Sequence, residues 1–370
     1  MSKATCTFVK ACALESSAFS SSLLQLAYWT SVAAMIVVAL MLIAIAALRA
    51  ALVLRERRER KVRARWRPIL AQSIEALPHA VPHIARLDRY LVLYLWNSLH
   101  ESLRGEAKEQ INKLALASGV DVIVRKLLAG RSLRARLVAL STLGHLQDKT
   151  RWNEIVALAR EDHPVISIVA ARALLMIDKD AALPLLMPLI VTRSDWPVAR
   201  VAGMLKEAGP DAVSEPVITA LANANEHQVQ RMVSYLRLVH IDQAALAIRG
   251  ILAKYQTPNL LAACLKVMAN PADLDVVRSH VAHSSWFVRV AVAHALGRIG
   301  RQEDVEALLK LLGDREWWVR YRAAQALISL PFLGKKELAA IAENLTDPFA
   351  RDILQQAVME GNGAKVSRGT

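Results

Sequence analysis

Histidine and cysteine are the side chains here that could bind a metal or transfer protons, and their spacing predicts no site. His79 and His83 are one helical turn apart in the sequence, but Pro82 lies between them and no carboxylate is near. A second set could converge across helices: His280, His283, His294, Asp273 and Asp275. Among the three cysteines no C-x-x-C pair occurs. We interpret the histidines as structural side chains and expect no metal.

Motifs of the common enzyme classes are missing as well. The sequence contains no Walker A loop, G-x-G-x-x-G, H-E-x-x-H, G-x-S-x-G or EF-hand loop. We therefore expect no catalytic residue, no cofactor and no enzyme activity.

Hydrophobic residues make up 54% of the 370 residues and aromatics only 5%, and the 14 Gly and 13 Pro are too few for a chain of strands and turns. The composition predicts an all-α protein.

The segment near the N-terminus is long and apolar. No charged residue occurs between Glu15 and Arg49, and residues 26–48 are almost all aliphatic. A helix of this length spans about 34 Å, enough for a hydrocarbon core of about 30 Å. Tyr28 and Trp29 at its start fit an interfacial aromatic anchor. These features predict a single transmembrane helix.

A basic segment follows the apolar one. Residues 49–67 contain nine Lys or Arg against Glu56 and Glu59. The positive-inside rule then places the N-terminus outside and the long C-terminal part in the cytoplasm, which predicts a single-pass inner-membrane protein. Eight side chains could also lie on anionic lipid headgroups: Arg55, Arg57, Arg58, Arg60, Lys61, Arg63, Arg65 and Arg67. The alternative is a solvated stalk that acts only as an orientation signal.

Two other interpretations of the N-terminus are weaker. A signal peptide, and with it a secreted or periplasmic protein, would have a shorter apolar core, and a dense arginine cluster behind a cleavage site opposes translocation. A buried helix of a soluble protein would be amphipathic or shorter.

The rest of the chain carries an internal repeat. Segments 286–300 and 317–331 superimpose when the first is shifted so that Trp286 falls on Trp317, an offset of 31. One leucine of this match recurs toward the N-terminus at spacings of 31 residues, and once of 29. We call these residues the anchor leucines: Leu143, Leu174, Leu205, Leu236, Leu265, Leu296 and Leu327. The residue three positions earlier is always apolar and mostly small: Leu140, Ala171, Ala202, Val233, Ala262, Ala293 and Ala324. Apolar periodicity on both sides of a short turn predicts two amphipathic helices per repeat, which must stack to bury their apolar faces.

The pattern V-R-x-x-A-A-x-A-L-G at this period resembles the short HEAT repeats of the type found in phycobilin lyases. It is clearest from Val288 and from Val319. The resemblance implies a right-handed α-solenoid of about eight to nine helix pairs, and a role for Arg289, Arg320 and Arg351 in a ladder between repeats. No pigment site is evident. The HEAT-like metal hydroxylases carry several His-Glu pairs, whereas this chain has only the pair that starts at His100.

The sequence therefore divides into a short extracytoplasmic segment, 1–25; the transmembrane helix, 26–48; a basic juxtamembrane helix, 49–67; a junction and N-terminal cap, 68–97; the repeat array, 98–360; and a disordered tail, 361–370. Within the junction we expect Pro68, Pro78 and Pro82 to interrupt any helix, and the apolar run 89–99 to cover the first repeat.

Charge and aromatic residues bear on the partner. The net charge is +14, but residues 1–97 account for +8 of it, and no basic stripe recurs at the repeat period from Lys310. We therefore expect no nucleic acid as a partner. Four tryptophans near the starts of predicted helices are candidates for partner contact, with packing between repeats as the alternative: Trp196, Trp286, Trp317 and Trp318.

Together these features predict a membrane-anchored bacterial HEAT-repeat protein. Its expected function is that of a non-catalytic scaffold whose cytoplasmic array holds a protein partner, for example a membrane enzyme such as a polysaccharide synthase. A repeat-fold enzyme and a secreted or periplasmic repeat protein are the alternatives.

The basic segment provides a test of orientation. Changing four of its arginines to glutamine should invert or scramble the topology, because the excess of Lys and Arg behind the span then falls by more than half. Reporter fusions at the two ends of the chain measure this, and an unchanged topology would contradict the predicted orientation.

Overall fold

The computed structural model describes residues 4–75 and 83–366, with side chains described over 28–75 and 83–360. Every regular element in these ranges is a helix, so the predicted all-α fold is confirmed. The chain divides into two compact units, Met1–Val120 and Asp121–Thr370, called unit 1 and unit 2 below. Pro78, Pro82 and His79, discussed above, lie outside the described residues.

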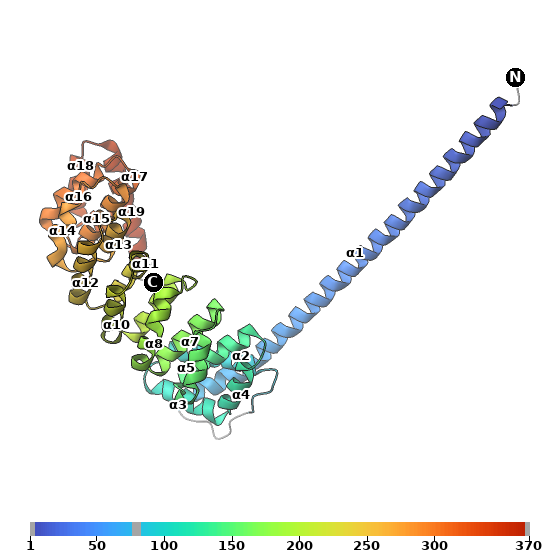
Figure 1. Cartoon of the computed structure of the whole chain (residues 1–370), viewed down its shortest axis with the longest axis horizontal. Coiled ribbons are helices and arrows are strands. Elements are labelled where there is room, and N and C mark those ends of the chain that lie inside the picture. Colours follow the sequence, from blue (N-terminus) through green and yellow to red (C-terminus); the bar gives the residue numbers. More distant parts are fainter. Residues whose placement is uncertain (1–3, 76–82, 367–370) are drawn as a thin grey trace. The chain divides into compact units, whose positions relative to one another are not determined.

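Unit 1 is built on one long helix. Helix α1 (Ala4–Gln72) contains both the predicted membrane span and the basic segment. Near its C-terminal end Val62, Trp66 and Leu70 are buried, and their regular spacing of one helical turn puts them on one face. This end of α1 packs against α2 (Arg89–Ser102). Helix α3 (Glu106–Ala117) follows, and the indole of Trp96 on α2 donates a hydrogen bond to the carbonyl of Ile111 at 3.0 Å. Figure 1 shows α2 beside the end of α1.

The expectation that Pro68 interrupts the helix is wrong. Helix α1 continues past Pro68 to Gln72. Proline removes one backbone hydrogen bond, but Trp66 and Leu70, on either side of it, are 3% and 4% exposed and are held against the neighbouring helix. Tertiary packing therefore outweighs the local preference.

Unit 2 is a series of helix pairs (Figure 1). The first helices of the pairs are α5 (Leu133–Leu146), α7 (Pro164–Ile177), α9 (Val198–Ala208), α11 (Glu226–Met232) continued by the 3-10 helix η2 (Val233–Leu238), α13 (Pro258–Val267), α15 (Trp286–Ile299), α17 (Trp317–Ser329) and α19 (Pro348–Val366). All of them except α19 carry an anchor leucine. The second helices are α6 (Trp152–Ala159), α8 (Lys179–Thr192), α10 (Pro210–Ala222), α12 (Ile241–Lys254), α14 (Leu274–Ser279), α16 (Val305–Leu312) and α18 (Lys335–Asn344). Helix α4 (Val120–Leu128) precedes the first pair.

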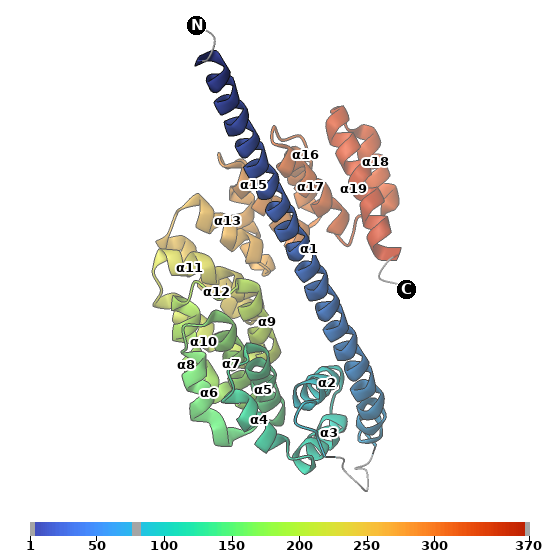
Figure 2. The same cartoon turned by 90° about the vertical axis from the view of Figure 1, so that its right-hand side faces the viewer.

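Consecutive first helices pack against each other along unit 2. Figure 2 shows α13, α15, α17 and α19 following one another in this way. All seven anchor leucines are at most 1% exposed, and the residues three positions earlier are also buried except for the half-buried Ala202. The predicted stacking of repeats is therefore confirmed over residues 133–329. Helix α19 ends at Val366, so it extends into the predicted tail, 361–370, of which 367–370 lie outside the described residues.

The residue after each anchor leucine decides how closely neighbouring first helices approach. At Gly297 an added Cβ would lie 2.8 Å from the Cα of Ala326, and at Gly144 it would lie 3.1 Å from the Cα of Ala173. Gly297 thus permits a backbone contact that a side chain would block, and Gly144 permits one that a side chain would crowd. In the central repeats the same position holds Lys206, Arg237 and Lys266, whose long side chains are exposed.

A pair of glycine substitutions tests this close contact. Gly297→Ala should destabilise the protein by about 1–3 kcal/mol, because the new methyl group overlaps the backbone of the next repeat. Gly203→Ala, inside α9 with nothing within 4 Å of the added atom, should stabilise it by about 0.5–1 kcal/mol through helix propensity. Thermal unfolding of the full chain in detergent, followed by tryptophan fluorescence, measures both changes. Equal melting midpoints for the two variants would contradict the proposed contact.

Candidate functional site

Each of the three C-terminal first helices, α15, α17 and α19, carries an arginine near its start that bonds to polar groups at the ends of helices. The guanidinium of Arg289 is 8% exposed and donates to both carboxylate oxygens of Asp314 at 2.6 and 2.8 Å. It also donates to the carbonyls of His283 and Ser284 at 2.8 and 3.0 Å. Burial opposes ionisation of Asp314, but the hydrogen bonds from Arg289 and from the backbone of Glu316, together with the nearby positive charges, outweigh it and hold the pKa of this carboxyl below its usual value. Arg289 therefore has the ladder role that the HEAT resemblance implied.

The next two arginines continue this pattern. Arg320 donates to the carbonyl of Asp314 and to the carboxylate of Asp347, the latter at 3.4 Å. Arg351 donates to the carbonyls of Ala342 and Leu345. All three arginines are thus used by the fold.

A second set of ion pairs and hydrogen bonds was not found from the sequence. An aspartate recurs with the period of the repeat at the start of the second helices, at Asp211, Asp242, Asp273 and Asp304. Their partners are His240 at 2.9 Å, Asn270 at 3.0 Å, Arg249 at 2.7 Å and Arg278 at 2.7 Å, respectively. The period of the aspartates was the signal that could have revealed them.

The candidate metal ligands do not form a metal site. Asp273 is buried and bonded to Arg249, and Asp275 lies 3.3 Å from the guanidinium of Arg278. The rings of His280 and His283 are 6.1 Å apart, while Nδ1 of His294 lies 3.2 Å from a guanidinium nitrogen of Arg298. Within the described residues, no group of three or more His, Cys, Asp or Glu is arranged to hold a metal ion.

The basic residues of α1 fall into two classes. Arg58 donates to one carboxylate oxygen of Asp88 at 2.7 and 2.8 Å. Arg55, Arg60 and Arg63 pair with glutamates one helical turn away, at 3.1, 3.7 and 3.7 Å respectively. The remaining four are exposed and have no carboxylate partner among the described side chains: Arg57, Lys61, Arg65 and Arg67.

The apolar part of α1 is exposed over its whole described length. Tyr28 and Trp29 are 64% and 67% exposed, and their rings meet edge to face at 5.8 Å. Within Tyr28–Gln72 the most apolar window has a mean hydropathy of 2.8, and none of it is buried. Helix α1 is therefore long and apolar enough to cross a membrane, a property that a signal sequence near the N-terminus shares.

The candidate aromatics separate by burial. Trp196 is only 3% exposed, and its indole donates to the hydroxyl of Ser167 in the preceding repeat at 2.9 Å. The expectation that Trp196 contacts a partner is therefore wrong, because a buried indole needs a hydrogen-bond acceptor and Ser167 supplies it. In contrast, Trp286, Trp317 and Trp318 are 43%, 49% and 58% exposed.

These three tryptophans belong to a larger exposed surface. Phe349, which occupies the position of Trp318 in the following repeat and was not singled out from the sequence, is 68% exposed. We call Trp286, Trp317, Trp318 and Phe349 the aromatic ridge. Trp317 stacks on Tyr321 with ring centres 5.1 Å apart, and the guanidinium of Arg320 lies 5.9 Å from the centre of the Phe349 ring. These contacts hold the ridge in place on the starts of α15, α17 and α19.

A basic groove lies farther along α15 and α17. Its cavity of about 330 Å³ is lined by His294, Gly297, Arg298, Arg322, Gln325, Ala326 and Ser329. Burial, and then the nearby charges of Arg298, Arg322, Arg237 and Lys266, lowers the pKa of His294 to about 4. These cations lie on successive first helices, whereas the comparison of the sequence at the repeat period started from Lys310, which is on a second helix.

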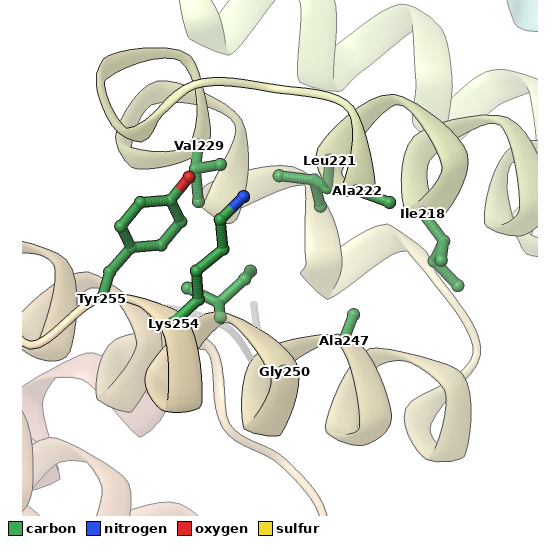
Figure 3. Close-up of a pocket in the computed structure, with 9 residues that line it drawn as sticks. Ile218, Leu221, Ala222, Val229, Ala247, Gly250, Lys254 and Tyr255 are labelled. Carbon is green, nitrogen blue, oxygen red and sulfur yellow. The ribbon is translucent and has the colours of Figure 1, made fainter.

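An apolar pocket occupies the region between α10, α11 and α12. It has a volume of about 190 Å³ and is lined by Ile218, Leu221, Ala222, Val229, Ala247, Gly250, Ile251, Lys254 and Tyr255. Figure 3 shows Lys254 and Tyr255 side by side at the end near Val229. The ammonium of Lys254 lies 5.0 Å from the centre of the Tyr255 ring. The missing side chain of Gly250 leaves this space open, since an added Cβ would meet nothing within 4 Å.

Comparison with known proteins identifies the family of the C-terminal helix pairs. Residues 244–328 and 274–360 match the protein family described as HEAT repeats. Residues 244–360 are HEAT repeats. They include the Arg289–Asp314 pair, the aromatic ridge and the basic groove. The pairs from α5 to η2 share the buried anchor leucines of these HEAT repeats but lie outside the matched range.

Other comparisons add little to the HEAT assignment. No curated protein matches the chain. Human deoxyhypusine hydroxylase in complex with glycerol is 18% identical, and the alignment covers 73% of this chain and 96% of that chain with a TM-score of 0.27. An engineered protein is 17% identical, with 73% and 84% covered and a TM-score of 0.30. At these TM-scores neither likeness carries an argument about this chain.

The lowered pKa of His294 predicts a pH dependence of stability. In the unfolded chain this histidine takes up a proton near pH 6.5, whereas in the folded HEAT repeats it does so only near pH 4. Folding therefore loses stability as the pH falls from about 6.5 toward 4. His294→Gln should reduce this loss, while His163→Gln, at an exposed position, should not. Melting midpoints between pH 7 and pH 4.5 measure the difference, and parallel curves for all three proteins would contradict the assignment.

Proposed function

We propose that this protein is a non-catalytic, membrane-tethered scaffold whose repeat array holds a protein partner. The observation that carries the proposal is the aromatic ridge: four large aromatic side chains remain 43–68% exposed on repeats whose anchor leucines are almost fully buried. Tryptophan is among the residue types most enriched at the energetic centres of protein interfaces. A ridge already held by Tyr321 and Arg320 loses little side-chain entropy on binding.

The tether is argued from α1. Its exposed apolar length would be covered by lipid, and the unpaired cations Arg57, Lys61, Arg65 and Arg67 would follow it onto anionic headgroups. Each such cation near the surface can contribute about 1 kcal/mol. By the positive-inside rule the N-terminus is outside and the array cytoplasmic, at the inner membrane of a bacterium.

Tethering the array to a membrane would allow a weak interface to hold its partner. A partner confined to the same membrane meets the array at a raised effective concentration, so an interface built on a few aromatic residues gives useful occupancy. A membrane enzyme such as a polysaccharide synthase is a partner class that such co-confinement would serve.

The central test is recovery of the partner from membranes. Gently crosslinked membranes are solubilised in detergent, the full chain is affinity-purified, and associated chains are identified by mass spectrometry. One stoichiometric membrane protein is expected. Trp318→Ala should reduce its recovery by about ten-fold or more, as for an interface hot spot, whereas Leu246→Ala, 66% exposed on α12, should not.

Two results would contradict the proposal. Equal recovery with the Trp318 and Leu246 variants would remove the ridge from the interface. A mature chain that begins after Ala47, found by N-terminal sequencing, would identify α1 as a signal sequence and place the array outside the cytoplasm.

A further inference from the structure

Positive charge gathers around His294 in unit 2. Four cations lie on successive first helices: Arg237 on η2, Lys266 on α13, Arg298 on α15 and Arg322 on α17. The charges of all four lower the pKa of His294. Within the described residues none of the four forms an ion pair. The side chains at the basic groove therefore make a row of uncompensated charge.

This row is costly for the protein on its own. Burial, and then the charge of Arg237, lowers the pKa of Arg298, which shows that like charges are crowded there. Elsewhere in unit 2 several arginines are matched by carboxylates, as Arg289 is by Asp314 and Arg136 is by Glu161. An anionic ligand on the row would supply the charge that the fold does not.

The groove is also rigid. Arg298 donates to the carbonyls of Lys266 and Met268 at 2.9 and 3.1 Å, and so caps the end of α13. The hydroxyl of Ser329 donates to the carbonyl of Gly297 at 2.9 Å, where α15 and α17 are in contact. These bonds hold the groove in shape without a ligand, which favours specific binding.

We propose that the basic groove and its row of cations bind an acidic, extended segment of the protein partner. Packed helices lie about 8–10 Å apart. A segment in the extended polyproline II conformation advances about 9 Å in three residues and returns every third side chain to the same face, so acidic side chains at every third position would match the cations. The aromatic ridge and the groove share a face of α17, because Trp318 and Arg322 are four residues apart on this helix. The segment would therefore carry an apolar residue for the ridge beside its acidic residues. This inference rests on the proposed function.

A nucleic acid fits the row less well than an acidic peptide. Duplex DNA carries a charge about every 1.7 Å, and its binding requires many phosphate contacts. Here each first helix supplies one cation to the row, and the whole of residues 121–370 has a net charge of only +6.

The test uses the full chain in a non-ionic detergent and a fluorescent peptide with glutamate at every third position and one leucine at its end. Anisotropy should show saturable binding. The Lys266→Gln/Arg322→Gln double variant should weaken it by about ten-fold, because both lost cations face the carboxylates. The Lys335→Gln/Lys336→Gln double variant, which removes equal charge from exposed positions on α18, should bind like the original chain. Melting midpoints confirm that both variants are folded.

The possible outcomes separate the hypotheses. Equal weakening in both double variants would mean attraction by overall charge and would overturn the proposed groove. Tighter binding of a single-stranded DNA of equal charge, lost in the Lys266/Arg322 variant, would make the row a nucleic-acid surface instead. No binding of the peptide would also overturn the inference. If the membrane partner is still recovered in full with this variant, the proposed scaffold function stands and only the acidic segment is wrong.

Discussion

The contact between successive first helices is the constraint on which the rest of the structure depends. A single helix pair has an apolar face that it cannot bury by itself, so each pair is stable only against its neighbours. Each anchor leucine therefore lies at a crossing and is almost fully buried, with an apolar and mostly small residue one turn earlier where the helices meet. At Gly297 the crossing is so close that even a methyl group has no room, and at Gly144 a methyl group would fit only if the next repeat shifted slightly.

Close stacking buries polar groups at the helix ends, and the arginines of the ladder form hydrogen bonds with them. Arg289 is the clearest case, because one guanidinium binds an aspartate of the next repeat and two carbonyls of its own turn. Removing one partner from such a buried pair leaves an uncompensated charge, so the ladder restricts how repeats can be arranged. The aspartates at the starts of the second helices do the same on the other side of each pair. Both sets of charged groups are used by the fold.

The surfaces available for binding are those that the stacking leaves over. Helix starts project beyond the crossings, so Trp318 and Phe349 stay exposed although they occur in regular repeats. After the anchor leucine, glycine gives way to Lys206, Arg237 and Lys266 in the central repeats, and there long cationic side chains replace backbone contact. The aromatic ridge and the basic groove are therefore two consequences of one packing arrangement. Their adjacency on α17 is the reason for proposing a single partner segment across both.

Periodicity is a local property, and the sequence by itself determined what periodicity controls: the all-α fold, the helix pairs, the anchor leucines and the apolar length of α1. The tertiary structure alone decided which side chains are free. Trp196 and Trp317 stand near the starts of equivalent helices, yet one is buried on Ser167 and the other is exposed. Likewise, Pro68 lies within a helix because neighbouring side chains pack against α2. In each case the outcome depends on groups in the neighbouring repeat or on another helix, and a single-residue pattern contains no information about them.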